Sequence, residues 1–193
     1  MTDEDKLLWA TFRKGDRDAF EGLLRAYYKS LLDYGFHFIK DRDILKDLVH
    51  DLFLNLWERR TFLNPDVTHL KPYLFKSLKH QIVNYLQKNT NHASLPEIWQ
   101  EKEPICDNYI ESSLIEQETL LANESRLQLA LSQLSKRQRE ILHLKYFESL
   151  SHEQIADVMA ISPQAVRNLL SQSLKSIREH WGFLFIALYH FLR

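Results

Sequence analysis

Two short helices joined by a tight turn are predicted over residues 151–175, and this stretch constrains the fold most strongly. Ser151 with Gln154 three residues later is a capping-box start, and Ser162 followed by Pro163 is a second helix start. Apolar residues recur at helical spacing in both segments, namely Ile155, Val158 and Met159, then Val166, Leu169, Leu170 and Leu174. The pattern is typical of a helix-turn-helix, whose second helix enters the DNA major groove.

The polar face of the second predicted helix carries candidate DNA contacts. They are Ser162, Gln164, Ala165, Arg167, Asn168, Ser171, Gln172 and Lys175. Arg and Asn can make bidentate contacts to guanine and adenine, while Ser, Gln and Lys suit phosphates or bases. The alternative is a plain helical corner with a solvated polar face. Ala160 stands in the turn, where glycine is common because the turn needs positive φ, at a cost on the order of 1 kcal/mol.

The composition favours an all-α protein. The chain has 193 residues, 45% of them hydrophobic, with only 4 Gly and 5 Pro, and no run alternates polar and apolar residues as several strands would. A single cysteine, Cys106, excludes an internal disulfide and a Cys-rich zinc site. The acidic N-terminus is no signal peptide. We therefore expect a protein of the reducing cytoplasm.

Charge is divided unevenly along the chain, although the net charge is only −1. Residues 69–90 hold four lysines and no acid, and residues 125–180 hold eight basic and five acidic residues. Between them, residues 97–124 hold eight acids against one lysine. Attraction to phosphate depends on this local distribution. The pattern indicates two basic segments joined by an acidic connector.

Besides the helix at about 68–88 described below, five further helices are expected, over about 3–14, 18–39 (capped by Asp18), 43–60, 113–133 and 135–147 (capped by Ser135). The helix at 43–60 carries a row of polar residues opposite its apolar side: Asp43, Asp47, Asp51, Asn55 and Glu58. This row is either a solvated acidic face or a docking surface for a basic partner. Leu54 beside it would be an exposed apolar contact, which favours docking.

A long helix over about 68–88 follows a loop at 61–67. Its predicted buried edge is Leu70, Leu74, Leu78, Ile82 and Leu86, and a second face carries Tyr73, Lys76, Lys79, His80, Asn84 and Gln87. Lysines interleaved with an aromatic and amides suit a single nucleic-acid strand, whose bases stack and whose phosphates pair. The alternative is a surface helix with lysines for solubility.

The C-terminal residues 181–193 are hydrophobic on every side but fall well short of the roughly 20 residues needed to span a bilayer. We expect them to pack on this domain, a second copy or a regulatory partner, without stable membrane insertion. Nine histidines are present, yet none stands at a metal-ligand spacing, and no phosphate loop occurs. We therefore predict a protein that is no enzyme and needs no cofactor or metal.

Two segments together resemble one family. The first resembles region 2 of bacterial sigma factors, and it runs from Ala19-Phe20-Glu21 through Asp47–Arg59 to Pro72-Tyr73-Leu74-Phe75 and Val83–Leu86. The residues from Leu134–Leu142 through the helix pair to Ile177-Arg178-Glu179 resemble region 4. With no region 3 between them, the chain resembles the extracytoplasmic-function (ECF) group of sigma-70-type factors. The implied domains are 1–90 (region 2), 91–124 (acidic linker), 125–180 (region 4) and 181–193 (hydrophobic tail).

The resemblance implies a role for each face. Asp47, Asp51, Leu54 and Asn55 would bind core RNA polymerase, through its β′ clamp helices, with β as the other contacted subunit. Asn64, Tyr73, Lys76, Lys79 and Asn84 would melt and hold the minus-10 element of promoter DNA. The helix from Ser162 would read the minus-35 element, and the acidic linker would thread the polymerase. An anti-sigma factor is the implied regulatory partner.

The sequence departs from the family pattern at three places. Leu169 and Gln172 stand where basic residues are common, Ala160 replaces the turn glycine, and the hydrophobic tail lies outside the shared pattern. Fewer phosphate contacts predict weaker free DNA affinity. One competing interpretation is a stand-alone helix-turn-helix activator that dimerises through its tail. Another is a polymerase adaptor with no DNA role.

Overall fold

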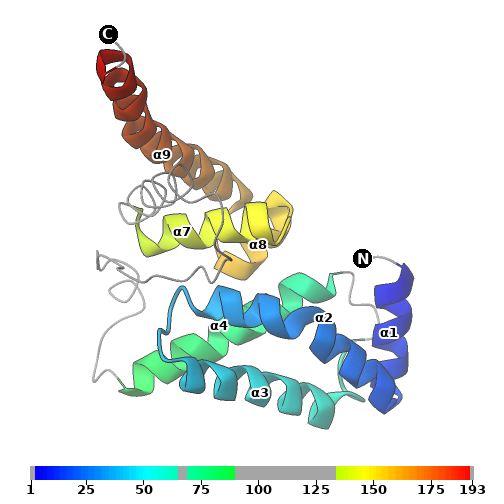
Figure 1. Cartoon of the computed structure of the whole chain (residues 1–193). Helices are drawn as coiled ribbons and strands as arrows, with labels where there is room; N and C mark the ends of the chain where they lie inside the picture. The colour runs from blue at the N-terminus through cyan, green and yellow to red at the C-terminus, as the bar shows by residue number, and fades with distance from the viewer. Residues whose placement is uncertain (1–2, 65–68, 90–133, 192–193) are drawn as a thin grey trace, which may run out of the picture.

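The computed structural model describes residues 3–64, 69–89 and 134–191, with side chains described for residues 6–64, 69–88 and 134–178 (Figure 1). The helices are α1 (Asp3–Arg13), α2 (Arg17–Gly35), α3 (Arg42–Arg59), α4 (Leu70–Asn89), α7 (Lys136–Leu142), the π-helical turn η1 (His143–Phe147), α8 (His152–Met159) and α9 (Pro163–Phe191). No strand occurs in these ranges, and the all-α prediction is confirmed. The predicted helix at 113–133 and the linker lie outside the described residues.

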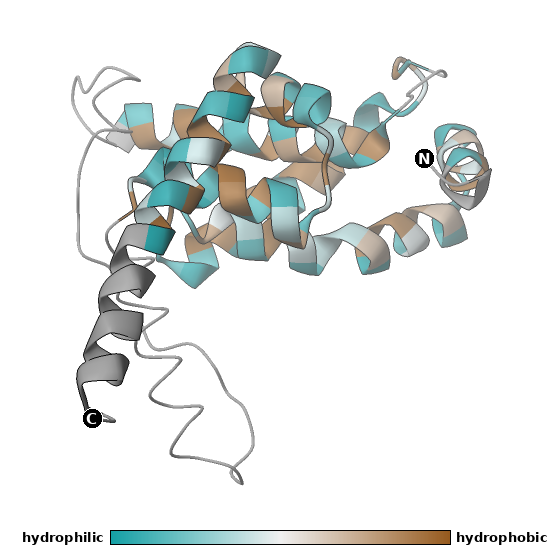
Figure 2. Ribbon diagram, turned by 90° about the horizontal axis from the view of Figure 1, so that it is seen from above, coloured by the Kyte–Doolittle hydropathy of each residue, from teal (hydrophilic) through white to brown (hydrophobic). Residues whose placement is uncertain are grey.

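Helices α1–α4 form the N-terminal domain. Helices α2, α3 and α4 all contact one another, and α1 packs on α2. Hydrophobic and hydrophilic residues are interspersed along these helices, as expected of amphipathic helices that pack on one side (Figure 2). The predicted edge of α4 is buried at Leu70, Leu74, Leu78 and Ile82 and half-buried at Leu86. Phe75 is also fully buried, and the predicted stripe did not include it.

The bounds of α2 differ from the prediction at both ends. Asp16, and not Asp18, caps the helix, because its Oδ1 accepts a hydrogen bond from the Ala19 amide at 2.9 Å. The preceding Gly15 has a φ of +91°, which only glycine adopts freely and which sets the chain direction into this cap. The helix ends at Gly35 and not near residue 39. A Cβ at Gly35 would collide with Leu45, so this glycine lets α2 and α3 approach closely.

The predicted helix at 135–147 begins as expected but does not stay an α-helix. Ser135 and Gln138 form a reciprocal capping box, and the Gln138 amide donates to Ser135 Oγ at 3.3 Å. After Leu142 the chain widens into the π-helical turn η1, in which the Glu148 amide donates to the His143 carbonyl at 3.1 Å. Tyr146 and Phe147, at the end of this wider turn, are exposed.

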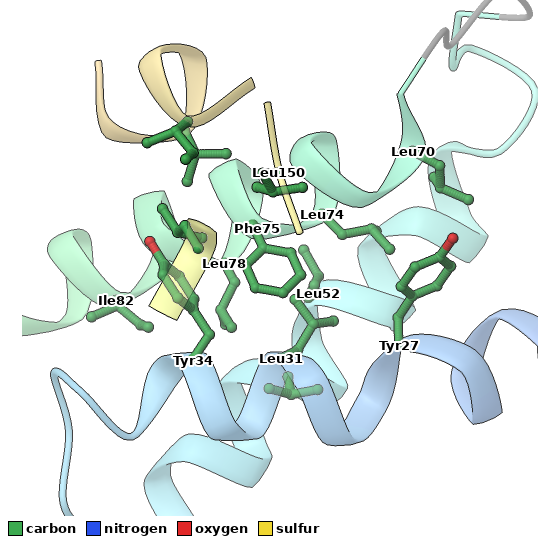
Figure 3. Close-up of a cluster of buried hydrophobic side chains, with 14 of the residues drawn as sticks. Tyr27, Leu31, Tyr34, Leu52, Leu70, Leu74, Phe75, Leu78, Ile82 and Leu150 are labelled. Carbon is green, nitrogen blue, oxygen red and sulfur yellow. The ribbon is translucent and has the colours of Figure 1, made fainter. Parts of the chain in front are cut away.

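Helices α7, α8 and α9 form the C-terminal domain, which packs against the N-terminal domain. Helix α8 lies against α4, and one cluster of buried side chains takes in both domains. Figure 3 shows Leu150, from the connection between η1 and α8, in the region of Leu74 and Phe75. Helix α9 continues to Phe191, so residues 181–191 of the predicted tail belong to the helix that begins at Pro163. Among the described residues no helix is both long and apolar enough to cross a membrane.

Candidate nucleic-acid and protein interfaces

The predicted helix-turn-helix is formed by α8, a tight turn and α9. Ser151 Oγ accepts from the Gln154 amide at 3.2 Å, and Gln154 Oε1 accepts from the Ser151 amide at 2.8 Å. Ser162 Oγ accepts from the Ala165 amide at 3.1 Å and begins α9, with Pro163 as its first residue. Both predicted helix starts are therefore confirmed.

The turn takes the conformation that its position demands. Ala160 has φ 53° and ψ 47°, in the left-handed region. A non-glycine residue there costs about 1 kcal/mol or more, so the sequence correctly identified a strained position. Ser149, before α8, is also left-handed, with φ 56°. The backbone is thus strained at both ends of α8. Burial of apolar residues of α8, such as Ile155 and Val158, must offset the free-energy cost of this strain.

The outward face of α9 is exposed as predicted. Gln164, Arg167, Asn168, Ser171, Gln172 and Lys175 are exposed, together with Ser162, while Ala165 is half-buried. Three of these side chains already form one hydrogen-bonded row. Gln164 Oε1 accepts from Arg167 Nη2 at 2.9 Å, and Gln164 Nε2 donates to Asn168 Oδ1 at 3.0 Å. An incoming base edge would exchange these bonds for its own.

The inner face of α9 departs from the predicted stripe at one residue. Val166 and Leu170 are buried and Leu169 is half-buried, but Leu174 is 39% exposed. The buried position next to it is Ser173, whose hydroxyl donates to the Leu169 carbonyl at 2.7 Å. A serine can take this place because its hydroxyl is satisfied within the helix, and apolar periodicity alone does not reveal it.

The polar row of α3 lies on the surface. Asp43, Asp47, Asp51, Asn55 and Glu58 are all exposed, and Leu54 beside them is 57% exposed. Asn55 Nδ2 donates to the Asp51 carbonyl at 2.7 Å, and Asp43 pairs with Lys46 at 3.0 Å. Asp47, Asp51 and Leu54 therefore present two carboxylates and an apolar side chain on one helix face, as a docking surface for a basic helix would need.

The predicted single-strand surface of α4 is divided between solvent and the C-terminal domain. Asn64 and Asn84 are exposed, and Tyr73 is half-buried against Trp9, with ring centroids 6.3 Å apart. Lys76 pairs with Asp157 of α8 at 2.6 Å, and Lys79 pairs with Glu140 of α7 at 2.7 Å. Lys79 is consequently only 12% exposed. In this arrangement Lys79 is closed to nucleic acid, whereas Lys76 stays 40% exposed but is paired with Asp157.

A groove of about 770 Å³ runs between α4 and α8. Its N-terminal wall includes Asn64, His69, Tyr73, Lys76 and His80, and its C-terminal wall includes Ser151, Glu153, Gln154 and Asp157. Three of the predicted minus-10 residues thus face the N-terminal half of the helix-turn-helix. Sequence patterns do not predict this juxtaposition, because the two walls are separated by more than sixty residues of chain.

The contact between the domains contains a buried polar cluster. Glu140 is fully buried, and its Oε1 accepts from Tyr34 at 2.8 Å and from Lys79 at 2.7 Å. Burial, and then the nearby Glu140 carboxylate, raise the pKa of Tyr34 well above 10.0, so its hydroxyl remains a donor. Beside them, the rings of His37 and His143 lie 4.7 Å apart, and burial lowers the pKa of His37 to about 3.

Glu148 closes this cluster on its other side. Its Oε2 lies 2.6 Å from Lys71 Nζ of α4, and its Oε1 lies 3.2 Å from His143 Nε2. Burial alone would raise the pKa of Glu148, but the contacts with His143 and Lys71 outweigh it and hold the pKa below 4.5. Within the described residues, no group of three or more His, Cys, Asp or Glu could hold a metal ion.

Known proteins match both domains. The family model described as Sigma-70 region 2 matches residues 23–92, and that described as Sigma-70, region 4 matches residues 124–177. The RNA polymerase sigma factor YlaC of Bacillus subtilis (strain 168) is 22% identical over 173 residues, which cover 85% of this chain and 92% of YlaC.

Solved structures share the fold. CnrH, in a complex with the cytosolic domain of CnrY, is 18% identical with a TM-score of 0.62, and the match covers 92% of this chain and 96% of CnrH. The sigma factor RpoE, in a complex with the anti-sigma factor NepR from Bartonella quintana, is 17% identical with a TM-score of 0.60, covering 84% and 96%. The region 2 match covers helices α2–α4, and the region 4 match covers α7, α8 and the first part of α9, in the order typical of the family. The chain therefore belongs to the sigma-70 family of RNA polymerase sigma factors, in the ECF group.

Proposed function

We propose that the chain binds core RNA polymerase through its β′ and β subunits and directs initiation at promoters with minus-10 and minus-35 elements. The observation that carries this proposal is the presence, in one chain and in family order, of a region 2 match on α2–α4 and a region 4 match on the helix-turn-helix. A stand-alone activator needs only the second.

Reconstitution tests the proposal. The purified chain should co-migrate with core polymerase and support transcription from its cognate promoter, and core alone should not. A tight footprint on a palindromic site without polymerase, together with no transcription from the reconstituted holoenzyme, would establish the activator instead.

The minus-35 element is assigned to the exposed face of α9. Changing both Arg167 and Asn168 to Ala should reduce promoter-directed transcription at least about tenfold, because a bidentate base contact contributes about 1–3 kcal/mol of discrimination. Core binding, measured by co-migration, should stay as in the wild type. Arg25→Ala is the matched control, since Arg25 is exposed on α2 and pairs with its neighbour Glu21 on the same helix. Unchanged transcription by the double variant would favour the polymerase adaptor.

The polymerase-docking face is assigned to Asp47, Asp51, Leu54 and Asn55 on α3. Reversing the charge of both Asp47 and Asp51 to Arg should weaken core binding on the order of tenfold or more, because like charges then oppose a basic partner. Affinity is measured by titrating labelled protein with core polymerase. Asp33→Arg provides a control, since Asp33 is exposed on α2. A loss of binding free energy in Asp33→Arg half as large as in the double variant, in proportion to charge changes of +2 and +4, would mean that overall charge, and not this face, determines binding.

An anti-sigma factor is the proposed regulator, and the cytoplasm is the proposed location, because core polymerase and promoter DNA are found there. The complex of RpoE with the anti-sigma factor NepR supports the first point for a protein of the same fold. Pull-down of the full chain from its native cells, followed by mass spectrometry, tests both partners together. Recovery of core subunits with no small co-purifying protein would argue against a dedicated anti-sigma factor.

A further inference from the structure

Positive charge gathers at the end of the N-terminal domain where α1 ends, α2 begins and α3 ends (Figure 1). A Cβ on Gly15, in the turn between α1 and α2, would lie 3.3 Å from Nε of Arg60, which follows α3, so this turn and the end of α3 are in contact. We name this cluster of cations the basic corner, and its members are Arg13, Lys14, Arg17, Arg59 and Arg60. The same two stretches hold three acids, namely Asp16, Asp18 and Glu58. The corner therefore keeps an excess of positive charge.

Two arginines of the corner are half-buried with donors to spare. Arg13 lies in the last turn of α1, its buried Nε has no hydrogen-bond partner, and among the described residues no carboxylate pairs with it. Arg60 has its Cζ 4.5 Å from the centroid of the Trp57 ring, and its Nη1 donates to the Trp57 carbonyl at 2.6 Å, but its Nε also lacks a partner. An arginine stays charged at physiological pH, and a partly buried charge is unfavourable without an anion. Both guanidinium groups are therefore able to bind an oxyanion that a ligand brings.

The arrangement suits a chain of phosphates better than a single anion. A guanidinium binds phosphate with two parallel donors, and a nucleic-acid backbone presents one phosphate for each nucleotide. Lys14, Arg17 and Arg59 are exposed around the two half-buried arginines. Phosphates before and after the one bound at Arg13 would consequently meet further cations, as electrostatic binding of a nucleic-acid backbone requires.

An exposed aromatic side chain follows the corner directly. Phe62 is 89% exposed, and its amide donates to the Arg59 carbonyl at 2.9 Å, so the turn that carries it continues from α3. Two residues later the Asn64 carbonyl accepts from the Trp9 indole at 3.1 Å, which joins this turn to α1. A row of cations beside an aromatic ring is the combination that binds single strands, whose phosphates pair while their bases stack.

Asn64 connects the basic corner with α4. It lines the groove that also contains Tyr73 and Lys76, and the Trp9 ring that binds its carbonyl lies with its centroid 6.3 Å from that of Tyr73. The residues assigned to the minus-10 strand therefore lead along the surface from α4 toward the corner. The contacts of Arg60 described above all lie within the N-terminal domain.

We propose that the basic corner is a phosphate site for the part of the single DNA strand that runs past Asn64 away from α4. Arg13 and Arg60 bind its phosphates, and Phe62 stacks on one of its bases. This inference rests on the proposed role of Asn64 and α4 in holding the minus-10 strand. It extends the strand from α4 to the end of the N-terminal domain where α1 and α3 end.

The salt dependence of oligo-dT binding tests the site in the free full-length chain. Fluorescence anisotropy of a labelled strand gives the affinity, and each lost phosphate contact reduces the slope of log affinity against log salt by about 0.7 for a single strand. Arg13→Gln should reduce the slope by this amount and weaken binding about fivefold at 0.1 M salt. Arg25→Gln is the matched control, because it removes the same charge from an exposed arginine of α2, and it should keep the slope of the wild type. A wild type that does not bind oligo-dT, or equal slopes in the two variants, would overturn the inference.

Phe62→Ala distinguishes a strand from free phosphate ions. Loss of the ring should weaken oligo-dT binding at least about fivefold, because a stacked base is lost, and should leave the salt slope unchanged, because the ring carries no charge. If Arg13→Gln reduces the slope while Phe62→Ala binds oligo-dT like the wild type, the corner is a general phosphate site and the assignment to a strand is wrong.

Thermal unfolding without DNA checks that the variants fold. Because Arg13 forms no ion pair within the described residues, Arg13→Gln should unfold within about 2 °C of the wild type. If it unfolds at a lower temperature, Arg59→Gln takes its place, since Arg59 is an exposed member of the corner. The same reduction in slope is expected there, and an unchanged slope would overturn the inference.

The outcomes separate this inference from the proposed function. The oligo-dT measurement contains no polymerase, so a failure of promoter-directed transcription would overturn the function and leave the binding result standing. Conversely, normal transcription combined with equal salt slopes of Arg13→Gln and Arg25→Gln would overturn the basic corner alone.

Discussion

Replacing Lys79 by Met should open the two domains of the free protein. The change leaves the Glu140 carboxylate buried, with the Tyr34 hydroxyl as its remaining donor among the described residues. Breaking a buried ion pair by removing one partner costs about 3–5 kcal/mol. Because separation returns Glu140 to water, we expect the domain equilibrium to shift toward the open form by about a hundredfold or more. Energy transfer between dyes on Glu58→Cys of α3 and Arg137→Cys of α7, in a chain with Cys106→Ser, measures this shift.

A second substitution distinguishes the buried charge from lost packing. Adding Glu140→Gln to Lys79→Met removes the orphaned charge and keeps an oxygen that can accept from Tyr34, so it should restore most of the closed form. Lys88→Met is the control, since Lys88 is an exposed lysine in the last turn of the same helix. If Lys79→Met opens the protein and the double variant opens it equally, the lysine stem and not the ion pair holds the contact.

Local signals explain why the helix-turn-helix could be predicted in detail. The capping box at Ser151, the start at Ser162 and the left-handed Ala160 each depend on residues within three or four positions of one another. The wrong N-cap predicted for α2 also concerns a choice between residues that are close together in the sequence. Asp16 and Asp18 are both acceptable caps, and the left-handed Gly15 favours the nearer one.

The contact between the domains could not be predicted, because its partners are far apart in sequence. Lys79 and Glu140 are 61 residues apart, and Lys76 and Asp157 are 81 apart. Residues 125–180 contain more basic than acidic residues, and this excess predicted attraction to DNA. Three of the five acids in that segment face α4, which a net charge does not show. The π-helical turn η1, which places His143 in this contact, also has no recognisable sequence signal.

Acidification should destabilise the closed protein between pH 7 and pH 5, and His37 should cause most of the effect. Burial first, and then the charges of His143, Lys40 and Arg139, lower the pKa of His37 from 6.5 to about 3. Below pH 6.5 the unfolded or opened chain therefore binds a proton that the closed form does not. Stability consequently falls as pH falls, by at most about 1.4 kcal/mol per pH unit for one proton. Glu148 acts in the same direction only below its ordinary pKa of 4.5.

Thermal unfolding and dye energy transfer, each followed from pH 7 to pH 5, test this assignment to His37. His37→Asn removes the titrating ring, so it should flatten the pH dependence while costing some stability at pH 7 through lost contact with His143. His50→Asn is the matched control, because His50 lies on the exposed side of α3 against Tyr28, outside the contact between the domains. It should keep the slope of the wild type. If the stability of His37→Asn depends on pH as steeply as that of the wild type, the acid sensitivity arises elsewhere in the chain. The polar cluster would then hold the domains together without responding to pH in this range.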